Sequence, residues 1–264
     1  MNKNNIDNTH IIKYIMYYVS VLAIFKNETA NLKVWLDHYI WQGVEHFYLI
    51  DNGSTDNPMA ILNDYIDKGY VTYSYGTKKH YQQQYYKDTF DNEKLKENTK
   101  WLVVCDLDEF YFGTSHKLST VLKGLEHYNL IYSCWLMFGS DGLIEQPPDI
   151  RKSITHREEI IKHKDSKYIF QTSAIPNSSH IWIHGLVNYY DDEHTLREDT
   201  LIHLNHYAIQ SLEFFQKIKM TRGAADFAEG EYVRNMDYFH EYDKDAKFQD
   251  LTLANLITNP PEDY

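Results

Sequence analysis

The chain has 264 residues, 43% of them hydrophobic, and a formal net charge of −12 at pH 7. This length and hydrophobic share fit one large domain with its own core, and the mean hydropathy of −0.57 indicates a soluble protein. The acidic balance argues against a nucleic-acid-binding protein, and two cysteines in apolar runs argue against a disulfide-stabilised scaffold.

The first apolar segment, residues 15–25, resembles the core of a signal peptide but is too short to span a bilayer. No small-residue cleavage site follows it, because the polar residues 26–28 come at once. We therefore expect a buried strand over 19–25, after a frayed terminus over residues 1–10. Without a predicted membrane span, the default expectation is a cytoplasmic protein, with room for peripheral contact with a membrane.

Strand and helix patterns alternate through roughly the first 110 residues. Apolar residues at helical spacing, from Leu32 to Ile40, predict a helix over 28–42 that ends at Gly43. Further helices are expected over 58–67 and 93–100, and further strands over 46–51, 70–75 and 101–105. This alternation is typical of an α/β fold with a mixed, mainly parallel central sheet and helices on both faces. Ligands of such folds bind beyond the carboxyl ends of the strands.

The second half of the chain has a less regular pattern. Strands are expected over 130–138, 168–174, 181–184 and 201–205, and helices over 119–128 and from 212 to beyond 219. The tail, with Pro260 and Pro261, is expected on the surface.

The segment Trp101–Phe110 is the most informative, because its short apolar run ends in Asp106-Leu-Asp108. If strand alternation continues here, both aspartates share one side and repel each other unless a cation lies between them. Mg²⁺ and Mn²⁺ prefer oxygen ligands and also bind substrate phosphates. The alternative is a solvated acidic loop. Because the polar clusters 26–28 and 51–52 also follow predicted strands, we expect one shared crevice.

Four motifs, in order, carry a resemblance to a known family over roughly residues 18–225. They are Lys26-Asn27-Glu28 through Asp51-Asn52-Gly53 to Asp56, Trp101 to Phe110, Trp135 through Phe138 to Gly142, and Asn205-His206-Tyr207 followed by Lys219 and Arg222. Together they resemble glycosyltransferases of the family 2 and family 92 type. The resemblance implies a GT-A fold in a single domain, 1–264. Its nucleotide-binding half would cover about 18–110, its acceptor-binding and metal-completing half about 111–225, and a C-terminal helical tail 226–264.

The resemblance also implies roles for individual residues. Asp106 and Asp108 would hold Mn²⁺ or Mg²⁺, and either His206 or its competitor His184 would complete the metal coordination. A neutral imidazole suits Mn²⁺, and basic side chains offset the charge on a departing UDP. The expected donor-binding residues are Lys26, Glu28, Asp51, Asn52, Gln82, Tyr86, Asp106, Lys219 and Arg222.

Several polar residues also have a purely structural interpretation. Glu28 would suit a helix N-terminus, and Asp51 would suit a side-chain-stabilised turn with the asparagine that follows it. For Lys217, a solvated helix face is the favoured interpretation. As general base we expect Asp141 in its Gly-Ser-Asp-Gly turn, with Glu158 as the second choice.

We therefore expect a metal-dependent enzyme that moves a hexose, such as galactose or glucose, from a UDP-sugar to a hydroxyl group of a glycan, lipid or protein, with inversion. One alternative is a non-catalytic protein that binds carbohydrate or nucleotide-sugar. The other is a metal-dependent nucleotidyltransferase or sugar-phosphate hydrolase, but its first loop would be rich in glycine and residues 26–29 contain none. No nucleic-acid partner is expected, and the sequence does not predict the oligomeric state.

Overall fold

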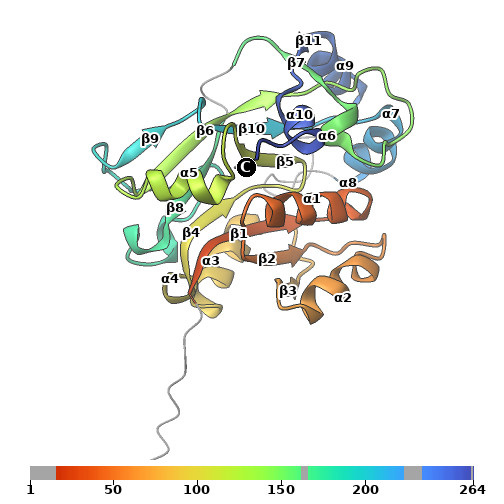
Figure 1. The fold of residues 1–264 in the computed structure, drawn as a ribbon. Coiled ribbons are helices and arrows are strands. Elements are labelled where there is room, and N and C mark those ends of the chain that lie inside the picture. The colour runs from red at the N-terminus through yellow and green to blue at the C-terminus, as the bar shows by residue number, and fades with distance from the viewer. Residues whose placement is uncertain (1–15, 162–165, 223–233, 263) are drawn as a thin grey trace, which may run out of the picture.

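The computed structural model describes residues 16–161, 166–222, 234–262 and 264. The predicted frayed terminus, 1–10, and the start of the predicted tail, 226–233, lie outside these ranges. Nine strands form one sheet in the order β3-β2-β1-β4-β8-β6-β10-β5, with β9 paired to β6 (Figure 1). The parallel pairs are β1–β2, β1–β4, β2–β3, β6–β10 and β6–β9, so the predicted mixed, mainly parallel α/β fold is confirmed.

The strands of this sheet are β1 Tyr17–Phe25, β2 His46–Asp51, β3 Val71–Tyr75, β4 Thr99–Val104, β5 Glu109–Gly113, β6 Leu130–Met137, β8 Ser166–Gln171, β9 Thr195–Arg197 and β10 Ile202–His206. A small second sheet pairs β7 His156–Glu158 with β11 Ala246–Gln249.

The helices are α1 Thr29–Trp41, α2 Met59–Asp67, α3 Gln82–Asn92, α4 Leu95–Asn98, α5 Leu118–Gly124, α6 Ile150–Ser153, α7 Leu212–Phe214, α8 Met220–Arg222, α9 Met236–Lys244 and α10 Thr252–Thr258. A π-helical turn, Phe215–Lys219, joins α7 to α8. Within the described ranges, no helix combines the length and apolarity needed to cross a bilayer.

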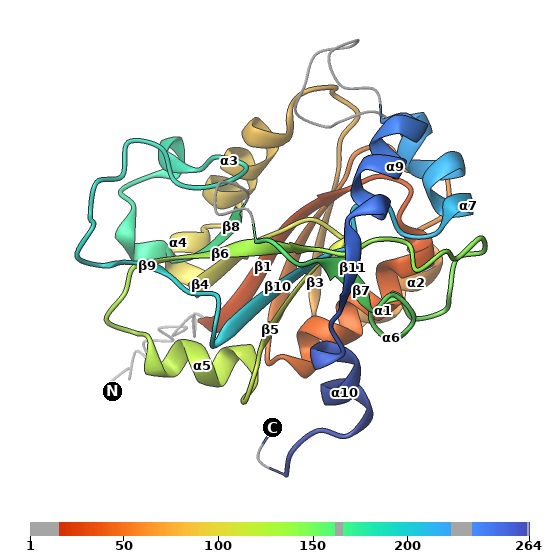
Figure 2. The same cartoon turned by 90° about the horizontal axis from the view of Figure 1, so that it is seen from above.

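Strand β1 is apolar along most of its length because both faces of the sheet are covered. Its side chains alternate between two cores: Val19, Val21, Ala23 and Phe25 pack with α1, whereas Leu22 and Ile24 pack with Tyr86 and Phe90 of α3. Figure 2 shows these two helices on opposite sides of the sheet. A strand covered on both faces reads as a continuous hydrophobic run.

The predicted elements of the first half lie close to the observed ones, with one exception. Strand β2 has the predicted bounds, and β1 and α1 differ from prediction by at most two residues at each end. The helix predicted over 93–100 forms only over Leu95–Asn98, as the short α4, because the strand that follows it already begins at Thr99. Helix α3 was missed because its sequence is polar and only Gln82, Tyr86 and Phe90 are buried.

The second half departs further from the predictions. No strand forms over 181–184, where the chain makes a turn closed by a bridge between Ile181 and Leu186. Strand β5 was missed because it follows the acidic segment with only a tight turn between. The predicted helical tail contains α9 and α10 but also β11, which pairs with β7.

Gln42, just after α1, joins three parts of the chain through one buried amide. Its Oε1 accepts hydrogen bonds from the backbone amides of Gly113 (3.2 Å) and Leu118 (2.8 Å). Its Nε2 donates to the hydroxyl group of Tyr264, at 2.7 Å. A buried amide with three partners fixes the position of α1 against β5 and α5.

His38, on the buried face of α1, is held in one neutral tautomer. Its Nε2–H donates to the carbonyl oxygen of Tyr111 at 2.8 Å, and Arg151 donates to its Nδ1 at 3.3 Å. Burial, with a smaller effect of Arg151, lowers the pKa of His38 to about 3. The imidazole is therefore uncharged at neutral pH.

We expect Gln42→Ala to lower the free energy of unfolding by about 2–4 kcal/mol, because two backbone amides and a tyrosine hydroxyl lose their buried partner. Urea unfolding monitored by circular dichroism measures this change. Gln84→Ala, on the exposed side of α3, is the matched control and should cost less than about 0.5 kcal/mol. Equal effects of the two substitutions would contradict the proposed role of Gln42.

We expect His38 to make the protein less stable in acid. The unfolded chain binds a proton at this residue near its ordinary pKa of 6.5, whereas the folded protein does so only near about 3. Stability from this group is complete above pH 6.5 and falls by about 1.4 kcal/mol per pH unit as the pH drops towards 3. Urea unfolding from pH 7 to 4 should give a shallower decline for His38→Gln. The exposed-site control His127→Gln should follow the wild type.

Candidate functional site

The two aspartates of the Asp-x-Asp sequence lie in a tight turn between β4 and β5. Trp35 of α1 holds this turn, because its indole N–H lies 3.2 Å from the carbonyl oxygen of Asp106 and 3.1 Å from that of Glu109. The backbone amide of Asp106 donates to Glu109 Oε2 at 2.8 Å. The expectation that strand alternation continues to Asp108 is wrong, since β4 ends at Val104.

Asp106 is paired with a buried lysine from the neighbouring strand β8. Lys167 Nζ lies 2.9 Å from Asp106 Oδ2 and 3.9 Å from Glu109 Oε2, and its side chain is fully buried. Burial alone would raise the pKa of Asp106, but Lys167 lowers it below its ordinary value. Burial raises the pKa of Glu109 well above its ordinary range despite Lys167. Lys167 therefore favours the ionised form of Asp106, whereas burial favours the neutral form of Glu109.

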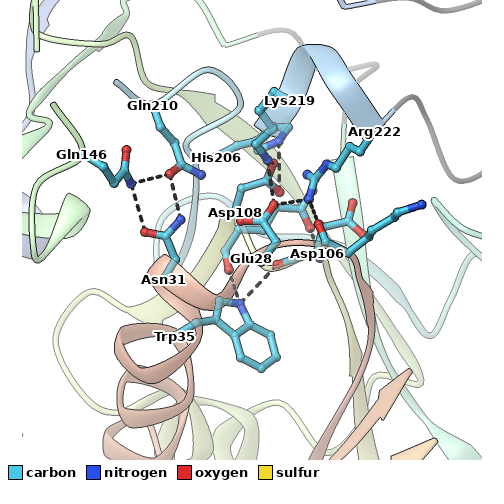
Figure 3. Close-up of polar contacts among 12 residues, drawn as sticks. Glu28, Asn31, Trp35, Asp106, Asp108, Gln146, His206, Gln210, Lys219 and Arg222 are labelled. Atoms are coloured by element: carbon cyan, nitrogen blue, oxygen red, sulfur yellow. Dashed lines mark hydrogen bonds and ion pairs between the residues drawn. The ribbon is translucent and has the colours of Figure 1, made fainter. Parts of the chain in front are cut away.

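A second buried cation, Lys219, lies between two carboxylates from distant parts of the chain (Figure 3). Its Nζ contacts Asp108 Oδ2 and lies 3.0 Å from Glu28 Oε1. Arg222 Nη1 lies 2.6 Å from the same Glu28 oxygen. Burial alone would raise the pKa of Asp108, but Lys219 and His206 hold it well below its usual range. These side chains form the inner ion cluster, defined as Glu28, Asp108, Lys219 and Arg222.

The π-helical turn Phe215–Lys219 carries Lys219, and α8, which follows it directly, carries Arg222. Such turns often occur at functional sites. Lys219 is fully buried, whereas Lys217 on the same turn is exposed and pairs with Glu213. This exposed pair confirms the solvated helix face predicted for Lys217. Glu28 does not cap α1, because its side chain makes no capping hydrogen bond and turns to the two cations instead.

Of the two histidines predicted to complete a metal site, His206 is the one placed against Asp108. Its Nε2 lies 3.7 Å from Asp108 Oδ1, at the end of β10. The ring of Trp135 contacts both imidazoles, and His184 contributes to the lowered pKa of Asp106. Burial, and then Lys167, lowers the pKa of His184 to about 4. His184 is therefore neutral at pH 7 and keeps a lone pair.

The donor atoms of this region fit a divalent cation that also binds a substrate. Asp108 Oδ1 and His206 Nε2 face each other, and Glu28 Oε2 is buried without a hydrogen-bond partner among the described residues. The described side chains do not form a ready-made cluster of three or more His, Cys, Asp or Glu ligands. Mg²⁺ is usually held by one or two carboxylates together with substrate phosphates, which is the arrangement these atoms could provide.

Two of the predicted donor-binding residues, Gln82 and Tyr86, lie near Asp106. Gln82 Nε2 donates to the hydroxyl group of Tyr86 at 2.9 Å and lies 3.5 Å from Asp106 Oδ1. Asp51 instead supports its own turn, where it accepts from the amide of Ser54 at 2.7 Å and from the hydroxyl group of Tyr73 at 3.0 Å. The side-chain-stabilised turn considered for Asp51 is therefore formed.

Two other predicted donor-binding residues, Asn52 and Lys26, make contacts within the protein. The side-chain amide nitrogen of Asn52 donates to the carbonyl oxygens of Gly76 and Lys78, at 3.2 and 3.3 Å. The backbone carbonyl oxygen of Lys26 accepts from Arg222 at 2.6 Å. Lys26 is thus tied to the inner ion cluster through its backbone.

The two predicted bases lie on the segment that follows β6. Asp141 accepts hydrogen bonds from the backbone amides of Thr155 and His156, at 2.8 and 3.0 Å, and from the hydroxyl group of Thr155. This carboxylate therefore fixes the end of the 139–149 loop. Glu158 is buried at the end of β7. A catalytic role for either residue stays a prediction.

A neutral amide cluster connects this loop to the site (Figure 3). Gln146 Nε2 donates to Gln210 Oε1 at 2.7 Å and to Asn31 Oδ1 at 3.0 Å, and Asn31 Nδ2 donates to Gln210 Oε1 at 2.8 Å. Gln210 is fully buried and has a left-handed backbone, φ 56°. The cluster thus ties α1, the 139–149 loop and the segment after His206 together.

Sequence reasoning missed Lys167 and Arg234. A lysine at the start of a strand buried on both faces needs a carboxylate partner, which is the signal that could have identified Lys167. Arg234 contributes to the low pKa of Asp108. No pattern around Arg234 in the sequence points to this contact.

Comparison with known families identifies the chain. The sequence model of glycosyltransferase family 92 matches residues 16–257, so the chain belongs to this family. The predicted resemblance is thereby confirmed, and together with the mixed sheet it confirms the GT-A type of fold. None of the curated proteins matches this chain.

Solved structures show remote similarity. S. aureus TarS 1–349 gives a TM-score of 0.43 at 13% identity, over 72% of this chain and 60% of that one. TarS 1–349 in complex with UDP gives 0.38 at 14%, over 60% and 47% of the two chains. GalNAc-T7 with UDP, GalNAc and Mn²⁺ gives 0.34 at 18%, over 47% and 23%. The chain thus spans less than two thirds of each of these proteins.

We expect Lys219→Met to lower the free energy of unfolding by about 3–5 kcal/mol, because it leaves two buried carboxylates without their shared cation. Adding Glu28→Gln should restore part of this loss, since one of the uncompensated charges is removed. Urea unfolding of both variants tests the pair. Lys217→Met, two residues away on the exposed side, is the control and should change stability by less than about 1 kcal/mol. A loss as small for Lys219→Met would refute the buried ion cluster.

Proposed function

We propose that this member of glycosyltransferase family 92 transfers a hexose from a UDP-sugar to a hydroxyl group of an acceptor, in a reaction that requires Mn²⁺ or Mg²⁺. The observation that carries the proposal is the inner ion cluster, which lies beside the Asp-x-Asp turn and His206 at the strand ends. The strand-end location is where α/β folds bind nucleotides.

The charges of the site support a requirement for a metal. Asp108 and Glu28 are neutralised internally by Lys219 and Arg222, so an incoming diphosphate finds these cations already paired. When Lys219 and Arg222 turn to the diphosphate, the two carboxylates lose their counter-charge. A bound divalent cation would restore that charge and stabilise the departing UDP.

We assign the residues of the site to three tasks. Asp106, Asp108 and His206 would hold the metal, with His184 as an alternative ligand. Lys219 and Arg222 would bind the diphosphate. The nucleoside and ribose would meet the predicted donor-binding residues Lys26, Asp51, Asn52, Gln82 and Tyr86, of which Gln82 already reaches Asp106.

The chemistry proposed is a displacement with inversion. The acceptor oxygen bonds to the anomeric carbon while the bond to UDP breaks, and a carboxylate takes the acceptor proton. The transition state resembles an oxocarbenium ion, as in glycoside hydrolysis. Asp141 and Glu158 stay the candidate bases.

Several finer points stay predictions. These are the hexose, the acceptor class and the cytoplasmic location. The non-catalytic interpretation, in which the site binds a nucleotide-sugar without transferring it, is an outcome of the experiment below. A nucleotidyltransferase is disfavoured by the family assignment.

We expect Asp108→Asn to reduce UDP release from UDP-hexoses with acceptor by about 10²–10³-fold, because it removes a charge that would hold the metal. The isosteric amide should preserve the fold, which thermal unfolding checks. Wild-type protein should also show a rise in Tm with UDP-sugar and Mn²⁺ together.

Asp64→Asn, at an exposed position on α2, is the control and should keep wild-type activity. Full activity of Asp108→Asn at any Mn²⁺ concentration would overturn the metal-site assignment. Binding of UDP-sugar without any UDP release would move the protein to the non-catalytic class.

A further inference from the structure

A row of aromatic rings leads from the proposed metal site to the protein surface. His206, which faces Asp108, lies with its ring centre 4.5 Å from that of Trp135. Trp135 lies 5.6 Å from His184, and His184 lies 5.4 Å from Trp182. We call these four side chains the aromatic row. Its outer member, Trp182, is 42% exposed, whereas His206 is buried.

The outer end of the row is built on a rigid turn. Ile181 and Ile183 point into the core, which leaves Trp182 on the opposite, outward side. The amide of Trp182 donates to the carbonyl oxygen of Gly185 at 3.0 Å, and the hydroxyl group of Tyr168 donates to the carbonyl oxygen of Trp182 at 2.6 Å. These hydrogen bonds fix the backbone that carries the indole, so little backbone entropy is lost when the ring stacks on a ligand.

The same turn is connected to the Asp-x-Asp segment. Lys167 Nζ, which pairs with Asp106 Oδ2 at 2.9 Å, also lies 3.4 Å from the carbonyl oxygen of Ile183. One buried ammonium group therefore sets the position of both the acidic turn and the turn that carries Trp182. This shared anchor places the aromatic row at a fixed distance from the proposed reaction centre.

We propose that the aromatic row is the acceptor subsite and that its ligand is a carbohydrate. This inference rests on the proposed function, since it names the acceptor class of that same site. A hexose ring presents an apolar C–H face that stacks on indole and a rim of hydroxyl groups that need hydrogen-bond partners.

The outer end of the row offers the stacking contact, because Trp182 provides an exposed ring face. Further in, the Nε1–H of Trp135 and the Nδ1 of His206 are buried and have no hydrogen-bond partner among the described residues. Because the row ends at His206 and Asp108, a sugar stacked along it would direct a hydroxyl group towards the donor.

The test uses the full chain with UDP-hexoses, Mn²⁺ and a panel of p-nitrophenyl glycosides of glucose, galactose, N-acetylglucosamine and N-acetylgalactosamine. We expect Trp182→Ala to raise the KM for the glycosides that are used by about tenfold, with kcat and the donor KM within about twofold of wild type. Trp182→Phe, which keeps a ring, should recover most of the loss. Phe248→Ala removes a side chain of similar exposure, 44%, on β11 and should leave all constants unchanged.

The competing acceptors are tested in parallel with serine- and threonine-containing peptides and with phosphatidylglycerol vesicles. Transfer only to peptides or vesicles, or an unchanged glycoside KM in Trp182→Ala, overturns the inference. Hydrolysis of the UDP-sugar by both wild type and Trp182→Ala would show that the donor site works. Either of the overturning results, obtained together with this hydrolysis, would then count against the aromatic row and not against the proposed function. If no UDP-sugar binds or reacts, the proposed function fails. Quenching of tryptophan fluorescence by the glycosides, absent in Trp182→Ala, would still support the subsite.

Discussion

The burial of one ammonium group, that of Lys219, constrains the arrangement of the whole site. A charge removed from water costs several kcal/mol unless it is paired, so Lys219 can lie in the interior only where Glu28 and Asp108 meet it. These residues come from the end of β1, the turn after β4 and the helical segment after β10. The parallel pairing of β1 with β4 brings the first two to one edge of the sheet, and the pairing of β10 with β5 brings the third.

The requirement that a buried charge be paired also applies at Asp106, where Lys167 is the buried cation. The two carboxylates of the Asp-x-Asp segment thus have separate lysine partners on opposite sides. A site organised in this way is electrically balanced before any substrate arrives. Under the proposed function, substrate binding would then be an exchange of partners, in which phosphate and metal replace contacts that the protein makes with itself.

Much of the first half of the chain could be predicted from the sequence because its signals are local. The apolar run of β1 and the helical spacing of α1 report burial on the sheet faces, and Asp106 and Asp108 stand out directly after an apolar strand. The ion pairs could not be predicted, because Lys167 and Asp106 are 61 positions apart and no periodicity encodes their contact. The turn at Trp182 is predicted as a strand because its sequence, Ile-Trp-Ile, consists of residues that favour strands.

The amide cluster of Asn31, Gln146 and Gln210 differs from the ion pairs in what disturbs it. Its hydrogen bonds join neutral groups, so neither salt nor a change of pH weakens them by screening or titration. The ion pairs around Lys219 can therefore break and re-form during a reaction cycle while the 139–149 loop keeps its place on α1. The protein thus combines ion pairs that can change partners with an amide cluster that stays intact. The amide cluster holds the surrounding segments in place while the ion pairs around Lys219 change partners.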